Sequence, residues 1–385
     1  MSRIIPCQKH LFDIPPGIHY FNCAYISPMM RTAKAAAQVG LDRESQPWRI
    51  RPIDFFEPVE EARGLFARII GATADDIAIV PSTSYGIATA AKNLPLAEGQ
   101  KILTLEEQFP SNVYTWREAA ALSGARLEVV ARPEDGDWTR AVLEALDDRV
   151  AIAALPNNHW TDGGLLDLVA IGRRVREIGA AFVLDTSQSM GALPLDVGEV
   201  RPDFLVTSGY KWMLCPYSVS FLYAAPHRQQ GSPLEENGMN RRDGVDFARM
   251  AVLKDEYAAG ARRFDVGERA HFTLMPATLE ILRQILEWGV ADIQATLSHT
   301  TAAVAQEARD LGLPSLAPDK RAGHFLGLQF PRRDFPNGPP DSLPEALSEA
   351  GVYVSIRGSS LRVTPHLWND EADRSALFEV LKRML

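Results

Sequence analysis

The sequence predicts an α/β protein with a mostly parallel sheet of seven strands and a smaller α+β part at its C-terminal end. Two observations support this prediction. From about residue 55, segments of helical length with apolar residues three or four positions apart alternate with short β-branched runs, as in successive βα units. The chain of 385 residues is also longer than an ordinary domain with a single hydrophobic core.

The strands are expected as short apolar runs between turn-forming residues, and the helices as the longer periodic segments. The expected strands are 77–80, 102–105, 127–130, 151–155, 181–184, 204–207 and 219–223. The expected helices are 56–70, 85–93, 112–123, 138–146 and 166–178, with one long helix around 276–311. The polar, arginine-rich stretch around 230–265 is expected to cross the surface.

The end of the chain is predicted to form the smaller α+β part. It contains the strand-like runs HFLGLQF, VYVSI and LRVTP, and the helical stretches DSLPEALSEAG and NDEADRSALFEVLKRML. We therefore divide the chain into an N-terminal segment (1–20), a large α/β domain (21–270) and a linking helix with a small domain (271–385).

The composition restricts the function classes. Hydrophobic residues make up 46% and charged residues 23%, which is typical of a folded protein in water. The net charge of −9 argues against general binding to nucleic acid or acidic lipid, and no apolar run is long enough to span a membrane. The three cysteines lack the spacing of a zinc site or a disulfide framework, so we expect no metal and a cytoplasmic location.

In a parallel sheet, ligands bind beyond the carboxyl ends of the strands. Asp185 directly follows one apolar run, and Lys211 follows the next, flanked by Gly209, Tyr210 and Trp212. An apolar setting lowers the pKa of an amine and makes it a better nucleophile. Taken singly, Asp185 is typical of a helix cap and Lys211 of a lysine that reaches solvent. Their positions after neighbouring strands favour a shared site.

Other strand ends also carry polar or aromatic residues. The turn 81–86, with Thr83 and Ser84, opens a helix and offers N–H groups and hydroxyls to a phosphate, although ordinary capping explains it equally well. Phe109 can stack on a flat ring or simply pack in its loop. The loop 156–163, with His159, is rich in hydrogen-bonding groups.

Arg357 and Arg362 lie in strand-like sequence near the end of the chain. A buried arginine needs a partner, so Arg362 is a candidate for binding a substrate carboxylate through two parallel hydrogen bonds. The alternative is an ion pair with a nearby acid. Dinucleotide, nucleoside-triphosphate, zinc-protease and serine-hydrolase fingerprints are absent from the sequence.

The ordered set of these residues resembles the class V aminotransferase group of fold-type I pyridoxal 5′-phosphate enzymes, which includes cysteine desulfurases, kynureninases and isopenicillin N epimerase. The resemblance rests on Asp185-x-x-Gln188, Ser208-Gly209-Tyr210-Lys211-Trp212, Ser82-Thr83-Ser84, Arg263-Phe264-Asp265-Val266-Gly267 and Arg362-Val363-Thr364. It covers most of the chain, from about Tyr20 to the end. It implies an aspartate-aminotransferase-like fold, pyridoxal 5′-phosphate as cofactor and a homodimer with a shared active site.

By this resemblance, Lys211 carries the cofactor as a Schiff base and moves the Cα proton, while Asp185 pairs with the pyridinium nitrogen. Gln188 is implied to bind the phenolic oxygen, and Phe109 to stack on the ring. The positions that match the phosphate site are Thr83, Ser84, Ser208 and Tyr210.

The resemblance also implies an amino-acid substrate. Arg362 matches the arginine that binds the α-carboxylate, and Asn22, His159 and Arg269 are further candidates for substrate contacts. Glu268 and Arg269 replace the usual Thr-Pro of a loop that reaches the cofactor phosphate of the other subunit. Two roles for Arg269 stay open: it makes this phosphate contact in place of Thr-Pro, or it binds a substrate side chain.

The leading hypothesis for the reaction is an aminotransferase, and the alternative is a β-lyase or an epimerase on the same scaffold. A cysteine desulfurase is disfavoured, because the loop before Arg362 is a short RGSS without the mobile cysteine of those enzymes. A ligand-binding protein without catalysis is disfavoured by the pair of Lys211 and Asp185, since a pure binder has no need of the lysine.

Overall fold

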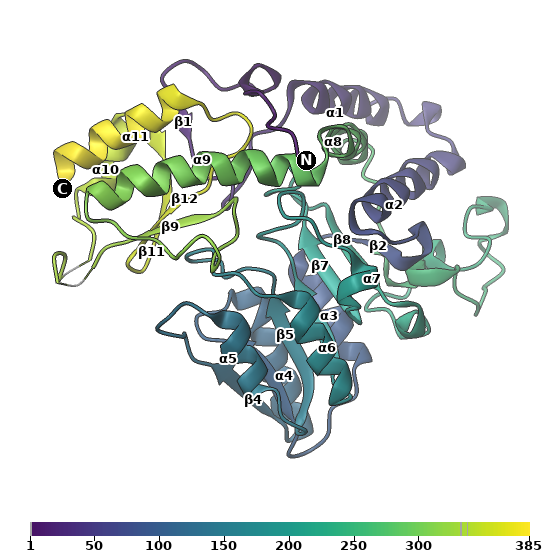
Figure 1. Cartoon of the computed structure of the whole chain (residues 1–385). Helices are drawn as coiled ribbons and strands as arrows, with labels where there is room; N and C mark the ends of the chain where they lie inside the picture. Colours follow the sequence, from purple (N-terminus) through teal and green to yellow (C-terminus); the bar gives the residue numbers. More distant parts are fainter. Residues whose placement is uncertain (1, 332, 337) are drawn as a thin grey trace.

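The computed structural model describes residues 2–331, 333–336 and 338–385. Within them the chain forms a seven-stranded sheet, a three-stranded sheet and one parallel pair of short strands. Figure 1 shows the large sheet and its helices in the lower and right part of the view, with the C-terminal elements at the left. Helix α9 (Val290–Asp310) extends from one part to the other.

The large sheet confirms the predicted fold class. Its strand order is β2-β8-β7-β6-β5-β3-β4, in which β8 runs antiparallel to both neighbours and all other neighbours are parallel. The strands lie within about a residue of their expected ranges. They are β2 (Ile77–Val80), β3 (Lys101–Leu105), β4 (Arg126–Val130), β5 (Val150–Pro156), β6 (Ala181–Asp185), β7 (Phe204–Ser208) and β8 (Ser220–Ala224).

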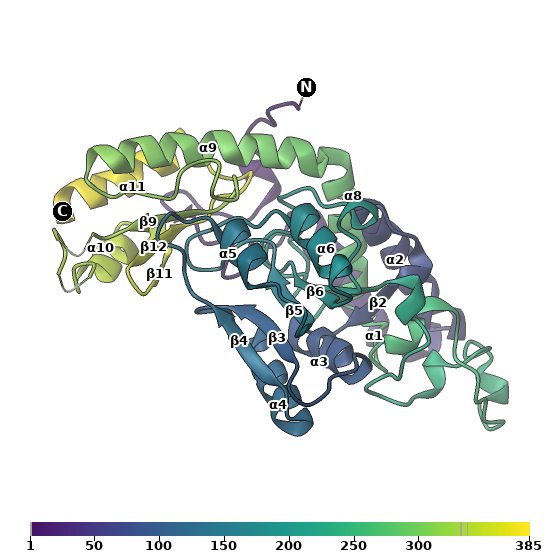
Figure 2. The same cartoon turned by 60° about the horizontal axis from the view of Figure 1, so that its bottom comes forward.

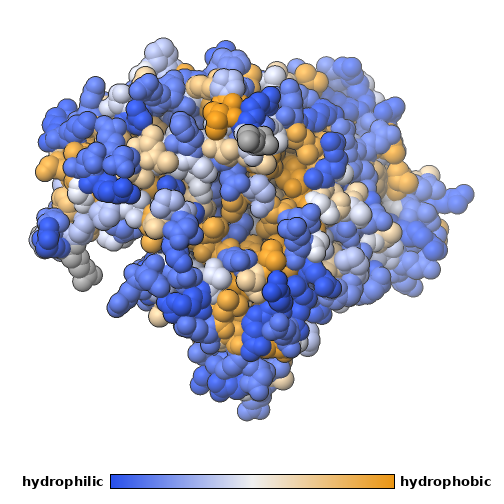
Figure 3. Space-filling model, viewed as in Figure 1, coloured by the Kyte–Doolittle hydropathy of each residue, from blue (hydrophilic) through white to orange (hydrophobic). Residues whose placement is uncertain are grey.

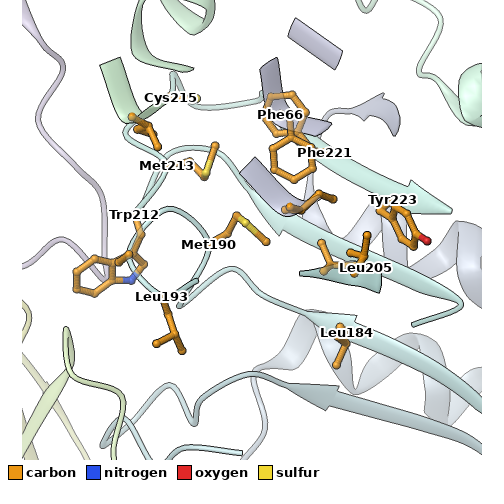
Figure 4. Packing of buried hydrophobic residues seen from close by; sticks show 14 of the residues in the cluster. Phe66, Leu184, Met190, Leu193, Leu205, Trp212, Met213, Cys215, Phe221 and Tyr223 are labelled. Carbon is orange, nitrogen blue, oxygen red and sulfur yellow. The ribbon is translucent and has the colours of Figure 1, made fainter. Parts of the chain in front are cut away.

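Helices cover both faces of this sheet, so alternate residues of a strand enter different cores (Figure 2). In β6, Phe182 packs into one apolar cluster and Val183 into the other. On the first face, Phe66 stacks on Phe221 with ring centroids 4.3 Å apart (Figure 4). Burial on both faces explains the continuous apolar runs of the sequence. The helices around the sheet are α1 (Arg31–Glu44), α2 (Glu57–Ile70), α3 (Thr83–Asn93), α4 (Tyr114–Ser123), α5 (Trp138–Ala145), α6 (Leu168–Glu177), α7 (Val197–Val200) and α8 (Leu274–Trp288).

The helices differ from the prediction in three places, one of which is the four-residue α7, which the prediction does not contain. The prediction of a single helix around 276–311 is wrong, because the chain forms two helices there, α8 and α9, which Gly289 separates. Gly289 has φ 78°, a left-handed conformation that ends a helix and that residues with a side chain rarely adopt. Helix α1 is absent from the prediction, because it buries only Ala33 and Gly40 and so lacks a strong apolar stripe.

The C-terminal elements form a second, antiparallel sheet in the order β11-β12-β9. Its elements are β9 (Leu326–Gln329), α10 (Leu343–Glu349), β11 (Ser355–Arg357), β12 (Ser360–Val363) and α11 (Glu371–Met384). The run VYVSI is divided between β11 and β10 (Val352–Tyr353), which pairs with β1 (His19–Tyr20) from the N-terminal end. The domain boundaries at residues 20 and 270 stay predictions.

The polar stretch around residues 230–265 contains only short 3₁₀ turns and projects at the right of Figure 1. A buried ion pair between Arg63 of α2 and Asp265 holds its end against the sheet, with both side chains inaccessible to water. Asp265 Oδ1 also accepts a hydrogen bond from Ile79 N at 2.8 Å. The stretch is therefore anchored to β2 although most of it lies at the surface.

Hydrophilic residues cover much of the face seen in Figure 3, and apolar residues show mainly near its centre. Among the helices of the described residues, none combines the length and the apolar character that crossing a bilayer requires.

A methyl group has no room at Gly86 but has room at Gly64. A Cβ at Gly86 would lie 2.6 Å from Val206 Cγ1, so Gly86→Ala is expected to push α3 from the sheet and to lower the free energy of unfolding by about 1–3 kcal/mol. Gly64 in α2 has no atom within 4 Å of that position, so Gly64→Ala is expected to stabilise the protein by about 0.5–1 kcal/mol. Urea unfolding measures both effects, and equal midpoints for the two variants would contradict this packing.

Candidate active site

A cavity of about 460 Å³ lies at the carboxyl edge of the large sheet, beyond the ends of β2, β6 and β7. The structure brings together there all of the residues that the sequence predicts for the catalytic and cofactor roles. They are Thr83, Ser84, Phe109, Asp185, Gln188, Ser208, Tyr210 and Lys211.

Lys211 lies in the wall of this cavity and is 6% exposed. Its Nζ lies 5.1 Å from the centroid of the Phe109 ring and 5.6 Å from that of the Tyr210 ring. Burial lowers the Lys211 pKa to about 8, although the Asp185 carboxylate acts in the opposite direction. The neutral amine is the nucleophilic form, so this setting makes Lys211 reactive closer to neutral pH than an ordinary lysine.

Gln188 is held in place by buried groups behind the cavity. Its Nε2 donates to Ala24 O at 3.1 Å, and its Oε1 accepts from Trp212 Nε1 at 3.1 Å. His324 Nε2 lies 2.6 Å from Gln188 O, and burial lowers the His324 pKa to about 4, so the neutral ring donates this hydrogen bond. Asp185, at the end of β6, accepts from Ser187 N at 3.0 Å. The side-chain amide of Gln188 and the carboxylate of Asp185 therefore keep fixed orientations.

A polar cup forms where β2 ends and α3 begins, opposite the end of β7. Thr83 Oγ1 and Ser187 Oγ lie 2.8 Å apart, and Ser84 Oγ lies 2.9 Å from Ser82 Oγ. Ser208 is 4% exposed, and its Oγ has no hydrogen-bond partner among the described residues. A buried unpaired hydroxyl is costly, and the N-terminus of α3 carries partial positive charge. The cup therefore fits an anion such as a phosphate group.

Two aromatic side chains form another wall. The rings of Phe109 and Trp160 meet edge to face with centroids 5.4 Å apart. Trp160 Nε1 donates to Glu107 O at 2.6 Å, which fixes the indole. A flat ligand can therefore pack against an aromatic surface beside Lys211.

A second cavity of about 400 Å³ adjoins the first and extends to the small sheet. Both cavities share Phe109, Trp160, Gln188, Tyr210, Lys211 and Tyr217 as lining residues. Arg362 of β12 lines the second cavity and is 2% exposed. Its Nη1 donates to Trp160 O at 3.0 Å, and its Nε has no partner within the described chain. Burial and the charge of Arg357 lower the Arg362 pKa to about 9.

Three residues that are predicted to contact the substrate lie outside the lining of both cavities: Asn22, His159 and Arg269. His159 is fully buried and stacks on Trp138 with centroids 5.2 Å apart, and burial lowers its pKa. Arg269 is 4% exposed, and its Nε lies 2.9 Å from Asp265 Oδ2. Within one chain, the polar groups of His159 and Arg269 therefore contact other protein groups, and a role of either residue in substrate binding stays a prediction.

Asn22 lies beside the second cavity. Its Oδ1 accepts from Ser355 Oγ at 2.7 Å, and Ser355 pairs across the small sheet with Arg362. Asn22 therefore supports the strand next to the predicted carboxylate-binding arginine.

Several lining residues are absent from the prediction. They include Tyr25, Trp160, Tyr217 and Arg357. Trp160 follows the predicted His159 directly, so the loop was identified correctly but the residue that faces the cavity was not. Tyr25 comes from the N-terminal end of the chain, where no strand or turn pattern indicates a site.

No cysteine is among the described lining residues of either cavity, although Cys23 lies near enough to Lys211 for the two groups to influence each other's pKa. Cys7 is exposed, Cys23 is buried, and Cys215 is buried close to Met213 (Figure 4). Burial raises the pKa of the Cys23 and Cys215 thiols. In the part of the chain that the structure describes, no three His, Cys, Asp or Glu side chains are grouped to hold a metal ion.

Comparison with known proteins gives one family. The model described as Aminotransferase class-V matches residues 52–359. The chain is 27% identical over 346 residues to "Uncharacterized aminotransferase YcbU" of Bacillus subtilis, covering 86% of this chain and 85% of that protein. It is 31% identical over 274 residues to a kynureninase of Deinococcus radiodurans, covering 66% and 63%. A cysteine desulfurase structure from Thermococcus onnurineus NA1 has the same fold, with a TM-score of 0.81, 18% identity, and coverage of 99% and 98%.

Lys211 is expected to react with aldehydes at a lower pH than an ordinary lysine. Because its pKa is lowered to about 8, its neutral fraction rises as the pH passes through that value. Reductive methylation of the cofactor-free protein, followed by mass spectrometry of its peptides, gives the rate at each lysine. Lys34, whose side chain is 70% exposed, serves as the internal reference. If the methylation rate of Lys211 depends on pH in the same way as that of Lys34, the lowered pKa of Lys211 is contradicted.

Removal of the Ser208 hydroxyl is expected to weaken anion binding but not the fold. Ser208→Ala deletes an unpaired buried group, so the free energy of unfolding stays equal or rises. The loss of one hydrogen bond to a charged oxygen is expected to weaken binding of inorganic phosphate by roughly tenfold or more. Calorimetric titration measures this binding, with Ser123→Ala at the end of α4 as the control. If the Ser208→Ala variant binds phosphate with unchanged affinity, Ser208 does not contribute to anion binding in this cup.

Proposed function

This chain belongs to the class V aminotransferase family, whose cofactor is pyridoxal 5′-phosphate, and we propose that it is an aminotransferase acting on the α-amino group of an amino acid. The observation that supports this most directly is the buried Lys211 amine, whose pKa is about 8. Lys211 is the one lysine among the described lining residues of the two cavities, and these include no histidine or cysteine.

The cavity walls fit the cofactor. We assign Asp185 to the ring nitrogen, Gln188 to the ring oxygen and Phe109 to the ring face. The phosphate is assigned to Thr83, Ser84, Ser208 and Tyr210, and the unpartnered Ser208 Oγ supports this assignment. When bound, the cofactor withdraws electrons from the bond that breaks at Cα. The Asp185 carboxylate would stabilise a proton on the ring nitrogen of the bound cofactor.

A single base favours amino-group transfer. With the cofactor bound, Lys211 Nζ would accept the proton from Cα and would deliver it to the cofactor carbon that takes over the amino nitrogen, so that one base serves both proton transfers. An epimerase must also deliver a proton from the opposite side, and the described walls provide no histidine or cysteine for that step. The 31% identity to a kynureninase supports a β-lyase as the second candidate, because such an enzyme uses the same first proton transfer.

Arg362 is assigned to the α-carboxylate of the substrate. Its guanidinium is almost fully buried, and its Nε has no partner among the described residues. A carboxylate would supply both a counter-charge and hydrogen-bond acceptors in this position. The hydrogen bond from Arg362 to Trp160 O keeps the guanidinium at the cavity.

Desulfurase chemistry is not favoured. The turn between β11 and β12 contains Gly358 and Ser359, and no described thiol lines the cavities. A persulfide would therefore have no cysteine within the site on which to form. The fold alone does not argue otherwise, because it is common to several reactions.

A homodimer with a shared active site and a cytoplasmic location are part of this proposal. Tyr25 and Tyr217 line the cavities although they are 59% and 65% exposed. Large apolar groups that are exposed at a ligand site are typical of a surface that a partner covers. A second copy of this chain is the partner that we propose.

Lys211→Ala is expected to abolish the borohydride-trapped cofactor adduct and to lower turnover with amino acids by at least about 100-fold, because the base for the Cα proton is lost. The visible spectrum and a keto-acid assay measure these effects. Lys382→Ala, a change at a side chain that is 56% exposed on α11, is the matched control and is expected to behave as the unmodified protein.

The outcome separates the candidates. Keto acid formed without ammonia supports an aminotransferase, ammonia release supports a lyase, and loss of chirality alone supports an epimerase. A protein that stays colourless with added pyridoxal 5′-phosphate would overturn the assignment of the cavity. An adduct that persists in Lys211→Ala would move the role to another lysine.

A further inference from the structure

The small sheet has one apolar face and one polar face. The apolar face, which includes Ile356 and Leu361, packs in the core of the C-terminal part. Alternate residues of a strand point to opposite faces, and residues paired across strands share a face. The residues of the polar face that pair across β11 and β12 are Ser355, Arg357, Ser360 and Arg362.

Arg357 and Arg362 are close neighbours on the polar face. Arg357 pairs with Ser360, and Arg362 lies two residues further along β12. Such diagonal neighbours in an antiparallel sheet lie roughly 7–8 Å apart. The turn that joins the strands contains only Gly358 and Ser359, so the hairpin holds both arginines in fixed positions.

The cavity does not neutralise these arginines. Its charged lining residues within the described chain are Lys211, Arg357 and Arg362, with no aspartate or glutamate. Arg357 Nη1 donates to Ile356 O at 2.7 Å, and Arg362 Nη1 donates to Trp160 O. Both guanidinium groups thus bind neutral carbonyl oxygens. Like charges in a partly buried site are unfavourable unless a ligand brings negative charge.

Arg132 is a useful contrast. It lines the adjoining cavity of about 780 Å³, which Arg357 also lines. There, Arg132 pairs with Glu107 at 3.0 Å and with Asp162. The described residues therefore supply carboxylates to Arg132 and none to Arg357 or Arg362, which line the second cavity together with Lys211.

We propose that Arg357 binds an anionic group at the end of the substrate side chain, while Arg362 binds the α-carboxylate. The substrate class is then α-amino acids with acidic side chains. Arg357 lines both the second cavity and the cavity of about 780 Å³ beside it, whereas Lys211 lines the second cavity but not the one of about 780 Å³. Arg357 therefore lies on the side away from the reacting amine, where the end of a side chain belongs. This inference rests on the proposed function for the role of Arg362 and adds the second anion.

The test compares dianionic and monoanionic probes of equal length. In calorimetric titrations of the holoenzyme, glutarate is expected to bind about tenfold or more tightly than pentanoate. Arg357→Gln is expected to remove this preference and to leave pentanoate binding unchanged, whereas Arg362→Gln weakens both. Arg126→Gln, on the edge strand β4 with a side chain that is 69% exposed, removes the same charge far from the cavity and is the control.

A second readout uses the visible spectrum. L-Glutamate and L-aspartate are expected to change the cofactor absorbance at lower concentrations than L-glutamine and L-asparagine, and Arg357→Gln is expected to equalise them. Equal responses in the unmodified protein, or a preference that survives Arg357→Gln, would overturn the inference while the proposed function stands. A glutarate preference lost in Arg357→Gln, together with no absorbance change by any amino acid, would support the anion site and overturn the proposed function.

Discussion

Burial of the large sheet on both faces is the constraint on which the rest of the molecule depends. Helices on each side leave room mainly for apolar side chains within the inner strands, so groups with chemistry gather beyond the strand ends. The parallel strands bring the ends of β6 and β7 to one edge, where Asp185 and Lys211 meet. The same burial lowers the Lys211 pKa, so the packing that stabilises the fold also prepares the amine.

Buried polar groups around the cavity are satisfied in two different ways. Gln188 and Trp212 bond to each other within the protein, which fixes the wall without a ligand. Asp265, from a stretch that supports the family resemblance, bonds to Arg63 and to the main chain of β2. Ser208 Oγ and Arg362 Nε have no such partners in the described chain. The contrast separates groups that bond within the protein from groups that have no partner among the described residues and that the proposed function assigns to bound ligands.

The fold is largely predictable from the sequence, because doubly buried strands leave uninterrupted apolar runs. The break at Gly289 is not, since apolar periodicity continues on both sides of it. In the site, residues that directly follow strands are predictable, but loop residues are not: His159 turns into the core and Trp160 faces the cavity. Arg357 is predictable in principle, because it alternates with apolar residues in the same phase as Arg362.

The break at Gly289 has a consequence for the whole molecule. Helix α8 packs on α1 and α2, whereas α9 begins in the same apolar cluster, through Ile293 and Leu297, and then packs on β9 and α11. The chain also crosses between the two parts at β1, which pairs with β10. A movement of the small part that bends the chain at both of these crossings would carry β11 and β12 as one unit, because the two strands are paired. Both arginines would then approach Lys211 in a single movement, and recognition of the substrate and exclusion of water would become the same event.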